Sequence, residues 1–145
     1  MQKISHAGVA ALVLFGASAS AQTALPLNTP TDVDGVTAVC TGIGSDNADN
    51  PAWKDYPLKI VVSGKKGQFL ADADVTIAGK SKTVATLRCE TPWFLVKLAP
   101  GRYKVSANRA GQIMTATATV PAHGQKQITI RYPNAGGEVS AEHTP

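Results

Sequence analysis

The sequence predicts an all-β protein, a seven-stranded antiparallel immunoglobulin-like β-sandwich preceded by an irregular N-terminal leader. Three observations support this class. Apolar and polar residues alternate over seven segments after position 56, which is the period of a half-buried strand. Turn residues separate these segments about every 8–12 positions, a spacing typical of sandwiches. No stretch beyond the first 21 residues carries a helical apolar stripe.

The clearest strand pair is expected within residues 92–109. Tyr103 and Val105 alternate there with polar side chains, so one face of this strand should be buried. Pro100 and Gly101 separate it from the preceding apolar segment. Proline followed by glycine favours the central positions of a type II turn. The sequence therefore predicts two strands joined at this turn.

Six other segments show the same alternation and complete the seven expected strands. Their buried-face residues are Leu58, Ile60 and Val62; Ala73, Val75 and Ile77; Ala85, Leu87 and Cys89; Phe94, Val96 and Leu98; Met114, Ala116, Ala118 and Val120; and Ile128, Ile130 and Tyr132.

The two flanks of this region look different from it. Residues 22–55 follow neither the strand nor the helix period and are rich in turn-forming residues. They are expected to form an irregular leader with at most a short strand at 36–39. Residues 133–145 have few apolar side chains, so the tail is expected to be disordered. The sandwich domain should span residues 56–132.

The first 21 residues have the features of a secretory signal peptide. Lys3 supplies the positive start, residues 7–16 form an apolar run, and residues 19–21 (ASA) fit the small-residue cleavage pattern. The run is shorter than the roughly 20 residues that a membrane-spanning helix needs. The sequence thus predicts a periplasmic or secreted protein that starts at Gln22 and has no integral membrane segment after cleavage.

The predicted export bears on the redox state of the two cysteines, Cys40 and Cys89. An oxidising compartment favours their pairing, and this disulfide would pin the leader at Cys40. Two cysteines without nearby histidines do not complete a tetrahedral metal site. No metal and no other cofactor is therefore expected.

Charge is unevenly distributed, with a net −4 in residues 22–55 and a net +9 in residues 56–132. A basic body would attract anionic partners such as envelope polysaccharide or lipid head groups. Alternatively, its cations, Lys59 among them, occupy the solvent faces of strands and discourage edge pairing. The second interpretation is preferred because no like-charge run exceeds Lys65-Lys66. Nucleic acid is disfavoured, since aromatic and basic residues are not interleaved.

Residues 98–105 (LAPGRYKV), followed by Gly111, Val120 and Gly124-Gln125, resemble the carboxypeptidase regulatory-like domain over roughly residues 56–132. The resemblance implies a small prealbumin-like β-sandwich in which this element forms a late hairpin. The family serves as accessory modules of larger proteins and as small exported bacterial proteins, which this chain resembles most. Prealbumin-like hydroxyisourate hydrolases use several histidines and a C-terminal Tyr-Arg-Gly-Ser, a motif that is absent here.

The sequence offers little catalytic chemistry. His123 falls in an expected turn, no serine has a nucleophile-elbow setting, and there is no His-Glu-x-x-His motif. Asp46, Asp49 and Asn50 supply oxygens without the spacing or the glycine of a calcium loop. An Asx-rich turn is the preferred interpretation of these three residues. The chain is therefore not expected to be an enzyme.

Aromatic residues are the remaining candidates for function. Trp93 should face away from Phe94, which makes the outer face of that strand partly apolar. The preferred interpretation is that the leader around Ile43 and Trp53 covers this face. The alternative is an exposed aromatic patch that binds a glycan or a partner protein. The candidate binding residues are Trp93, Trp53, Tyr56 and Lys97.

The sequence therefore favours a non-catalytic periplasmic or secreted binding or scaffold module for an envelope protein or polysaccharide. One alternative is an accessory subunit of a separate enzyme. Another is a stand-alone hydrolase on a prealbumin-like scaffold, which would need His123 to converge with an acid and a cationic group.

Overall fold

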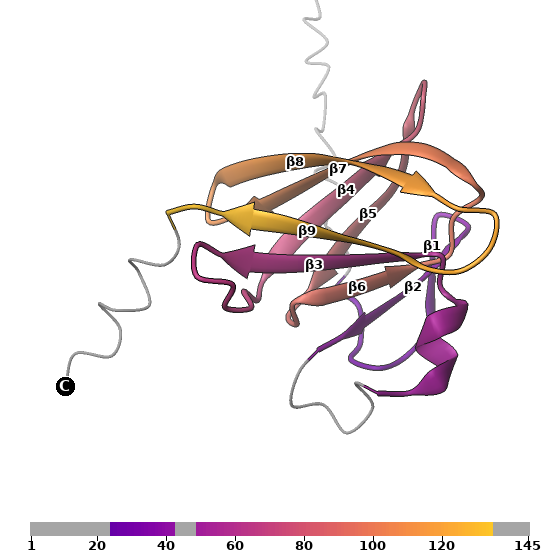
Figure 1. The fold of residues 1–145 in the computed structure, drawn as a ribbon, viewed down its shortest axis with the longest axis horizontal. Helices are drawn as coiled ribbons and strands as arrows, with labels where there is room; N and C mark the ends of the chain where they lie inside the picture. The colour runs from indigo at the N-terminus through magenta and orange to yellow at the C-terminus, as the bar shows by residue number, and fades with distance from the viewer. Residues whose placement is uncertain (1–23, 43–48, 135–145) are drawn as a thin grey trace, which may run out of the picture.

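The computed structural model describes residues 24–42 and 49–134 of the chain. The expected signal peptide at 1–21, residues 43–48 with Ile43 and Asp46, and the tail from 135 onward lie outside the described residues. Within the described ranges, nine strands form two sheets that pack face to face (Figure 1). The predicted all-β sandwich is confirmed, with nine strands in place of the seven expected.

One sheet has five strands and the other has four. In spatial order, the first sheet contains β1 (Thr31–Val33), β2 (Val36–Thr41), β6 (Trp93–Val96), β3 (Leu58–Gly64) and β9 (Lys126–Tyr132). The second sheet contains β5 (Thr83–Cys89), β4 (Ala73–Ala78), β7 (Gly101–Arg109) and β8 (Gln112–Val120). A short 3-10 helix, η1 (Pro51–Asp55), precedes β3.

The two additional strands, β1 and β2, come from the segment expected to be an irregular leader, and β2 contains the short strand expected at 36–39. Antiparallel pairing of β2 with β6 places Ala38 opposite Val96 and Cys40 opposite Phe94. Residues on both faces of β2 are buried, and a strand buried on both sides does not show the alternation of a half-buried one. The leader therefore supplies two strands of the sandwich, which the period of two does not reveal.

Two strands, β6 and β7, flank Pro100 as the sequence predicts, but they do not form the hairpin that the resemblance implies, because they belong to different sheets. β6 pairs with β2 and β3, whereas β7 pairs with β4 and β8. The connection around Pro100 thus crosses from one sheet to the other. Gly101 has a φ of +150°, whereas the third residue of a type II turn has a φ of about +80°. The connection therefore differs from the turn predicted from the sequence.

The pairing is mostly antiparallel, as expected, but β9 runs parallel to β3. Leu58 lies opposite Lys126 and Gly64 opposite Tyr132 in this ladder. Parallel neighbours need a long crossover connection, and the strands β4 to β8 provide most of it. β8 and β9 lie side by side along one border of the sandwich (Figure 1), so the crossover returns the chain to the edge of β3.

The main core lies between the sheets and contains residues from both of them. Tyr132 of β9 is almost fully buried there, and its hydroxyl donates a 2.7 Å hydrogen bond to the Ala107 carbonyl of β7. A disulfide joins Cys40 of β2 to Cys89 of β5, with 5.6 Å between their Cα atoms. The predicted pairing is confirmed, and it links the leader strand of one sheet to an edge strand of the other.

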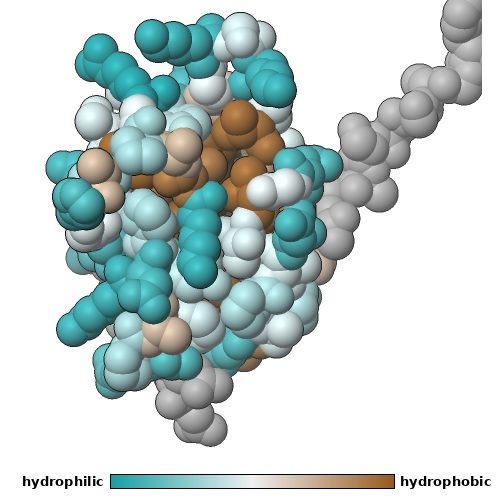
Figure 2. All heavy atoms as spheres, turned by 90° about the vertical axis from the view of Figure 1, so that its right-hand side faces the viewer, coloured by the Kyte–Doolittle hydropathy of each residue, from teal (hydrophilic) through white to brown (hydrophobic). Residues whose placement is uncertain are grey.

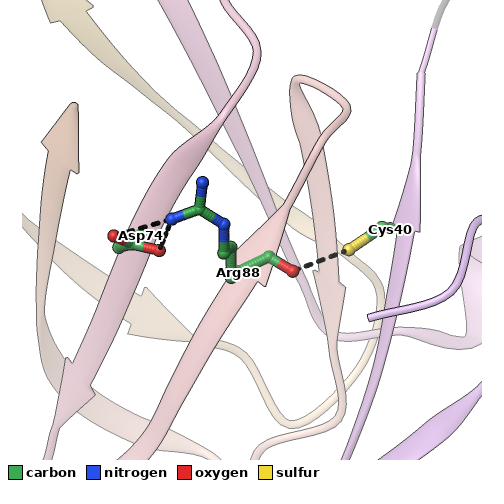
Figure 3. Close-up of polar contacts among 3 residues, drawn as sticks. All are labelled: Cys40, Asp74 and Arg88. Atoms are coloured by element: carbon green, nitrogen blue, oxygen red, sulfur yellow. Dashed lines mark hydrogen bonds and ion pairs between the residues drawn. The ribbon is translucent and has the colours of Figure 1, made fainter. Parts of the chain in front are cut away.

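Polar contacts at Arg88 lie next to this disulfide (Figure 3). The guanidinium of Arg88 forms an ion pair with Asp74 of the neighbouring strand at 3.2 Å. The carbonyl oxygen of Arg88 lies 3.7 Å from Cys40 Sγ and accepts a 2.9 Å hydrogen bond from the Leu25 backbone N–H. The start of the described chain is therefore attached to β5 close to the bridge.

Candidate functional site

The outer face of the five-stranded sheet is partly apolar because of its strand register. Val39 of β2 lies opposite Leu95 of β6, and Leu95 lies opposite Lys59 of β3. In the next row, Thr41 lies opposite Trp93. These side chains point away from the main core, since the residues between them along each strand point into it.

The helix η1 covers one part of this face. Trp53 is 8% exposed and Tyr56 is 3% exposed, and both pack against Val39 and Leu95. The two rings meet edge to face with their centroids 6.0 Å apart. The structure thus buries Trp53 on the face for which the sequence predicts a cover.

Polar side chains fix η1 in place at both of its ends. Asn50 caps it, because its side-chain oxygen accepts a 3.0 Å hydrogen bond from the Ala52 N–H. Gln125, in the β8–β9 connection, donates hydrogen bonds to the carbonyls of Trp53 and Tyr56 at 2.8 and 3.0 Å. The position of Trp53 therefore depends on a residue far along the chain.

A pocket of about 350 Å³ lies between η1 and strands β2, β3 and β6. η1 lies low on the right in Figure 1, and Figure 2 views the molecule from that side, where hydrophilic side chains cover most of the lower half and an apolar area lies above the level of η1. Two indoles, one aliphatic side chain and several polar groups form the pocket wall. The lining residues are Thr41, Asp49, Asn50, Trp53, Lys54, Lys59, Trp93, Leu95 and Gln125.

Lys59 is the central cation of this pocket. Its Nζ atom lies 3.7 Å from the centroid of the Trp93 ring, a cation–π contact. Burial lowers the pKa of Lys59 below its ordinary value, because desolvation disfavours the charged amine. Phe69 packs edge to face on Trp93 at 5.9 Å between centroids and is itself 44% exposed. Trp93 thus contacts both Lys59 and Phe69.

Two buried polar atoms at this site have no hydrogen-bond partner among the described residues. One is the hydroxyl oxygen of Thr41, a residue that is fully buried, and the other is Nε1 of Trp93. Buried polar groups are nearly always paired, so each exception calls for an explanation. Because Thr41 lines the pocket, a bound ligand would provide a partner for its hydroxyl.

The structure brings together two of the four predicted binding residues. Trp53 and Trp93 both line the pocket. Tyr56 is buried against Trp53, and Lys97 is exposed with its Nζ 4.9 Å from the Tyr56 ring centroid. Neither Tyr56 nor Lys97 is among the lining residues, and of the two only Tyr56 packs with Trp53.

Sequence reasoning missed Lys59, Thr41 and Gln125 as site residues. Lys59 was detectable in part, since strand alternation places it on the face opposite Leu58 and Ile60. Thr41 carries no such signal, because its position beside Trp93 depends on pairing between distant segments. Gln125 acts through backbone carbonyls, which no sequence pattern marks.

Two other candidates from the sequence, His123 and Asp49, have exposed side chains. His123 is exposed in the β8–β9 connection, and Asp49 is exposed at the pocket rim. In residues 24–42 and 49–134, no group of three or more His, Cys, Asp or Glu side chains is arranged to hold a metal ion. None of the helices in these ranges is long and apolar enough to cross a membrane.

Two shallower hollows of about 290 and 310 Å³ lie at the turn between β4 and β5. Lys80, Arg102 and Tyr103 line both of them. Neither lining includes any of the buried unpartnered side-chain atoms found in the described part of the chain. The pocket beside η1 is therefore the stronger candidate for a ligand site.

Comparison with protein-family models and with curated protein sequences finds no match to this chain. The resemblance to the carboxypeptidase regulatory-like domain therefore stays a prediction. The Cys40–Cys89 disulfide fits a protein that works outside the cytoplasm, because thiols are kept reduced inside it.

Proposed function

We propose that this chain is a non-catalytic periplasmic or secreted binding module that holds one part of an envelope polysaccharide in the pocket beside η1. The observation that carries the proposal is the pocket wall, which combines the indoles of Trp53 and Trp93 with the polar side chains of Asp49, Asn50 and Gln125. Sugar rings offer an apolar C–H face that packs on an indole and hydroxyl groups that pair with carboxylates and amides.

The size of the pocket supports a small ligand unit over a protein surface. Its volume of about 350 Å³ lies at the lower end of the usual range for ligand sites. Protein–protein interfaces are broader and bury roughly 800 Å² on each partner. One or two sugar rings of a longer chain would fit the concavity, while the rest of the polymer lies outside it.

The charged groups favour binding over glycoside hydrolysis. Hydrolysis of this kind generally uses two carboxyl groups on opposite sides of the scissile bond. Asp49 is the one carboxylate among the described lining residues, and the other charged side chains there are Lys54 and Lys59. This donor set suits recognition of a glycan without cleavage.

The test is a titration of the purified, disulfide-bonded protein with oligosaccharides prepared from envelope polysaccharides. Binding should change the tryptophan fluorescence, and Trp93→Ala should weaken it at least tenfold because the loss of a buried stacking surface costs more than about 1.4 kcal/mol. Ile113→Ala is the control, since Ile113 is 63% exposed on β8 and is not a lining residue. A folded Trp93→Ala variant that binds as well as the wild type would overturn the proposal.

A further inference from the structure

We infer that the sugar unit in this pocket carries a carboxylate, and that Lys59 and Thr41 receive this group beside the indole of Trp93. The inference rests on the proposed function and names the chemical class of the ligand: a uronic acid or another acidic sugar within a polysaccharide.

Three adjacent strands bring these groups together. Thr41 of β2 lies directly opposite Trp93 of β6, and Trp93 lies opposite Val61 of β3. Lys59 is two residues before Val61 and therefore points to the same face of β3. Its ammonium then reaches over the Trp93 ring, 3.7 Å from the centroid. Hydrogen-bonding groups from β2 and β3 thus flank the same indole.

The part of the pocket around Trp93, formed with Thr41 and Lys59, offers more hydrogen-bond donors than acceptors. The Lys59 ammonium carries three donors and no acceptor, and the Thr41 hydroxyl supplies another donor. The Thr41 oxygen is buried and has no partner within the described ranges. A carboxylate is acceptor-only and has about four lone-pair sites on two oxygens. It would accept from both groups and would also balance the ammonium charge, which a neutral sugar hydroxyl cannot do.

Within the described part of the chain, the charge of Lys59 also lacks a balancing group. No carboxylate of residues 24–42 and 49–134 lies within ion-pair distance of its Nζ atom. The ammonium is partly desolvated and rests on an aromatic face instead. The other charged groups that line the pocket are Lys54 and Asp49. A ligand carboxylate would give this ammonium the anionic partner that the described residues do not provide.

Two further lining residues and the net positive charge of the chain also favour an acidic sugar as the ligand. Asp49 and Asn50 line the pocket near η1, where they can accept hydrogen bonds from sugar hydroxyls. The chain has a formal net charge of +4, and residues 56–132 carry most of its cations. Such a field raises the local concentration of an acidic polymer and speeds its association.

A carboxylate fits better than a sulfate or phosphate group. Those anions are usually held by bidentate arginine or by backbone N–H groups at a helix N-terminus. The described lining residues include no arginine, and η1 has only five residues. A sulfated glycan is therefore a discriminating probe.

The experiment compares a galacturonic acid tetrasaccharide, its carboxyl-reduced galactose counterpart and a sulfated oligosaccharide of equal length by calorimetry and tryptophan fluorescence. We expect the uronic acid probe to bind at least tenfold more tightly than the neutral one at low salt, with a difference that shrinks at high salt. Lys59→Met should remove that tenfold preference, so that the acidic and neutral probes bind about equally. Thr41→Val should reduce the preference less, and Lys97→Met, outside the lining, should leave it unchanged.

The outcomes separate the inference from the proposed function. Equal affinity for the acidic and neutral probes, or a preference that survives Lys59→Met, overturns the carboxylate assignment while the glycan-binding function stands. Stronger binding of the sulfated probe also overturns that assignment. Failure to bind any saccharide overturns the proposed function itself. Thermal unfolding of each variant shows whether a loss of binding reflects the site or the fold.

Discussion

The ammonium group of Lys59 lies 3.7 Å from the centre of the Trp93 indole. The contact joins neighbouring strands of one sheet, and it places a cation where water is partly excluded. An indole face compensates only part of the lost hydration of an ammonium group. The contact therefore has a consequence for stability as well as for binding.

We expect the stability of the protein to rise with pH through the range in which Lys59 loses its proton. Burial lowers the Lys59 pKa in the folded state below the ordinary 10.5. In the pH range between the folded-state pKa and 10.5, Lys59 is protonated to a greater extent in the unfolded chain than in the folded protein. An increase in pH through this range therefore favours the folded state. Urea unfolding between pH 7 and 10.5 should show that the free energy of unfolding of the wild type rises relative to that of Lys59→Met as the pH approaches 10.5. A difference between the two proteins that stays constant over this whole range would contradict this origin, and Lys97→Met controls for the loss of a lysine charge.

Removal of the disulfide should destabilise the fold strongly. Cys40 and Cys89 link strands of different sheets across a sequence separation of 49 residues. Under the loop-entropy model, such a bridge contributes about 4 kcal/mol. Urea unfolding of Cys40→Ala/Cys89→Ala should show a loss of this order, and a reductant should lower the wild type to a similar value. A reductant effect on the double variant would mean that the agent acts elsewhere.

Leu95→Ala should cost about 2–5 kcal/mol, as truncation of a buried leucine generally does. Leu95 is 1% exposed and supports Trp53 and Tyr56 on the outer face of the sheet. Ile113→Ala, at a position that is 63% exposed, should change stability by less than about 0.5 kcal/mol. Chemical unfolding of both variants checks the contrast. Similar losses at the two positions would mean that η1 does not shield Leu95 in solution.

Gln125→Ala should weaken ligand binding and reduce stability by about 1 kcal/mol. Its side-chain amide donates hydrogen bonds to the carbonyls of Trp53 and Tyr56. Without these two hydrogen bonds, the position of Trp53 in the pocket is less well fixed. Gln127→Ala is the matched control, because Gln127 is exposed on β9 and outside the lining. Tryptophan fluorescence of the free variants should report a change for Gln125→Ala alone. Unaltered spectra and affinity in that variant would show that η1 is held by its packing.

Gly101→Val should destabilise the protein by about 1–3 kcal/mol, the usual cost of a strained backbone conformation. Gly101 begins β7 with a φ of +150°, which a β-branched residue rarely adopts. Space is not the obstacle, since a Cβ there would lie 3.9 Å from the Tyr103 ring. A thermal melt compares this variant with Gly101→Ala, which shares the backbone strain without the branched side chain. Melting temperatures equal to that of the wild type would show that the connection relaxes without cost.

Much of the fold was predictable from strand alternation. Segments such as Val75 to Ile77 and Val105 to Ala107 have one buried and one more exposed face. The alternation of apolar and polar residues along the sequence predicts this contrast. β2 was not predictable in this way, because Val39 and Cys40 are buried on opposite faces. Sheet membership was not predictable either, since it depends on pairing between segments far apart in the chain.

The candidate site was predictable only as a set of aromatic residues. Trp53 and Trp93 stand out by their size and scarcity, since the chain has two tryptophans. Their convergence on Lys59 and Thr41 depends on register between three strands and on a loop that closes over η1. Local patterns do not encode such distances, so the polar half of the site emerges only from the folded chain.

The parallel pairing of β3 with β9 has a consequence for biosynthesis. β3 is made early, while its neighbour Lys126–Tyr132 emerges from the ribosome near the end of translation. Until then, one side of β3 presents unpaired backbone groups that invite association with other chains. Truncated products that end before Lys126 should therefore be prone to aggregation and be natural targets for chaperones and proteases.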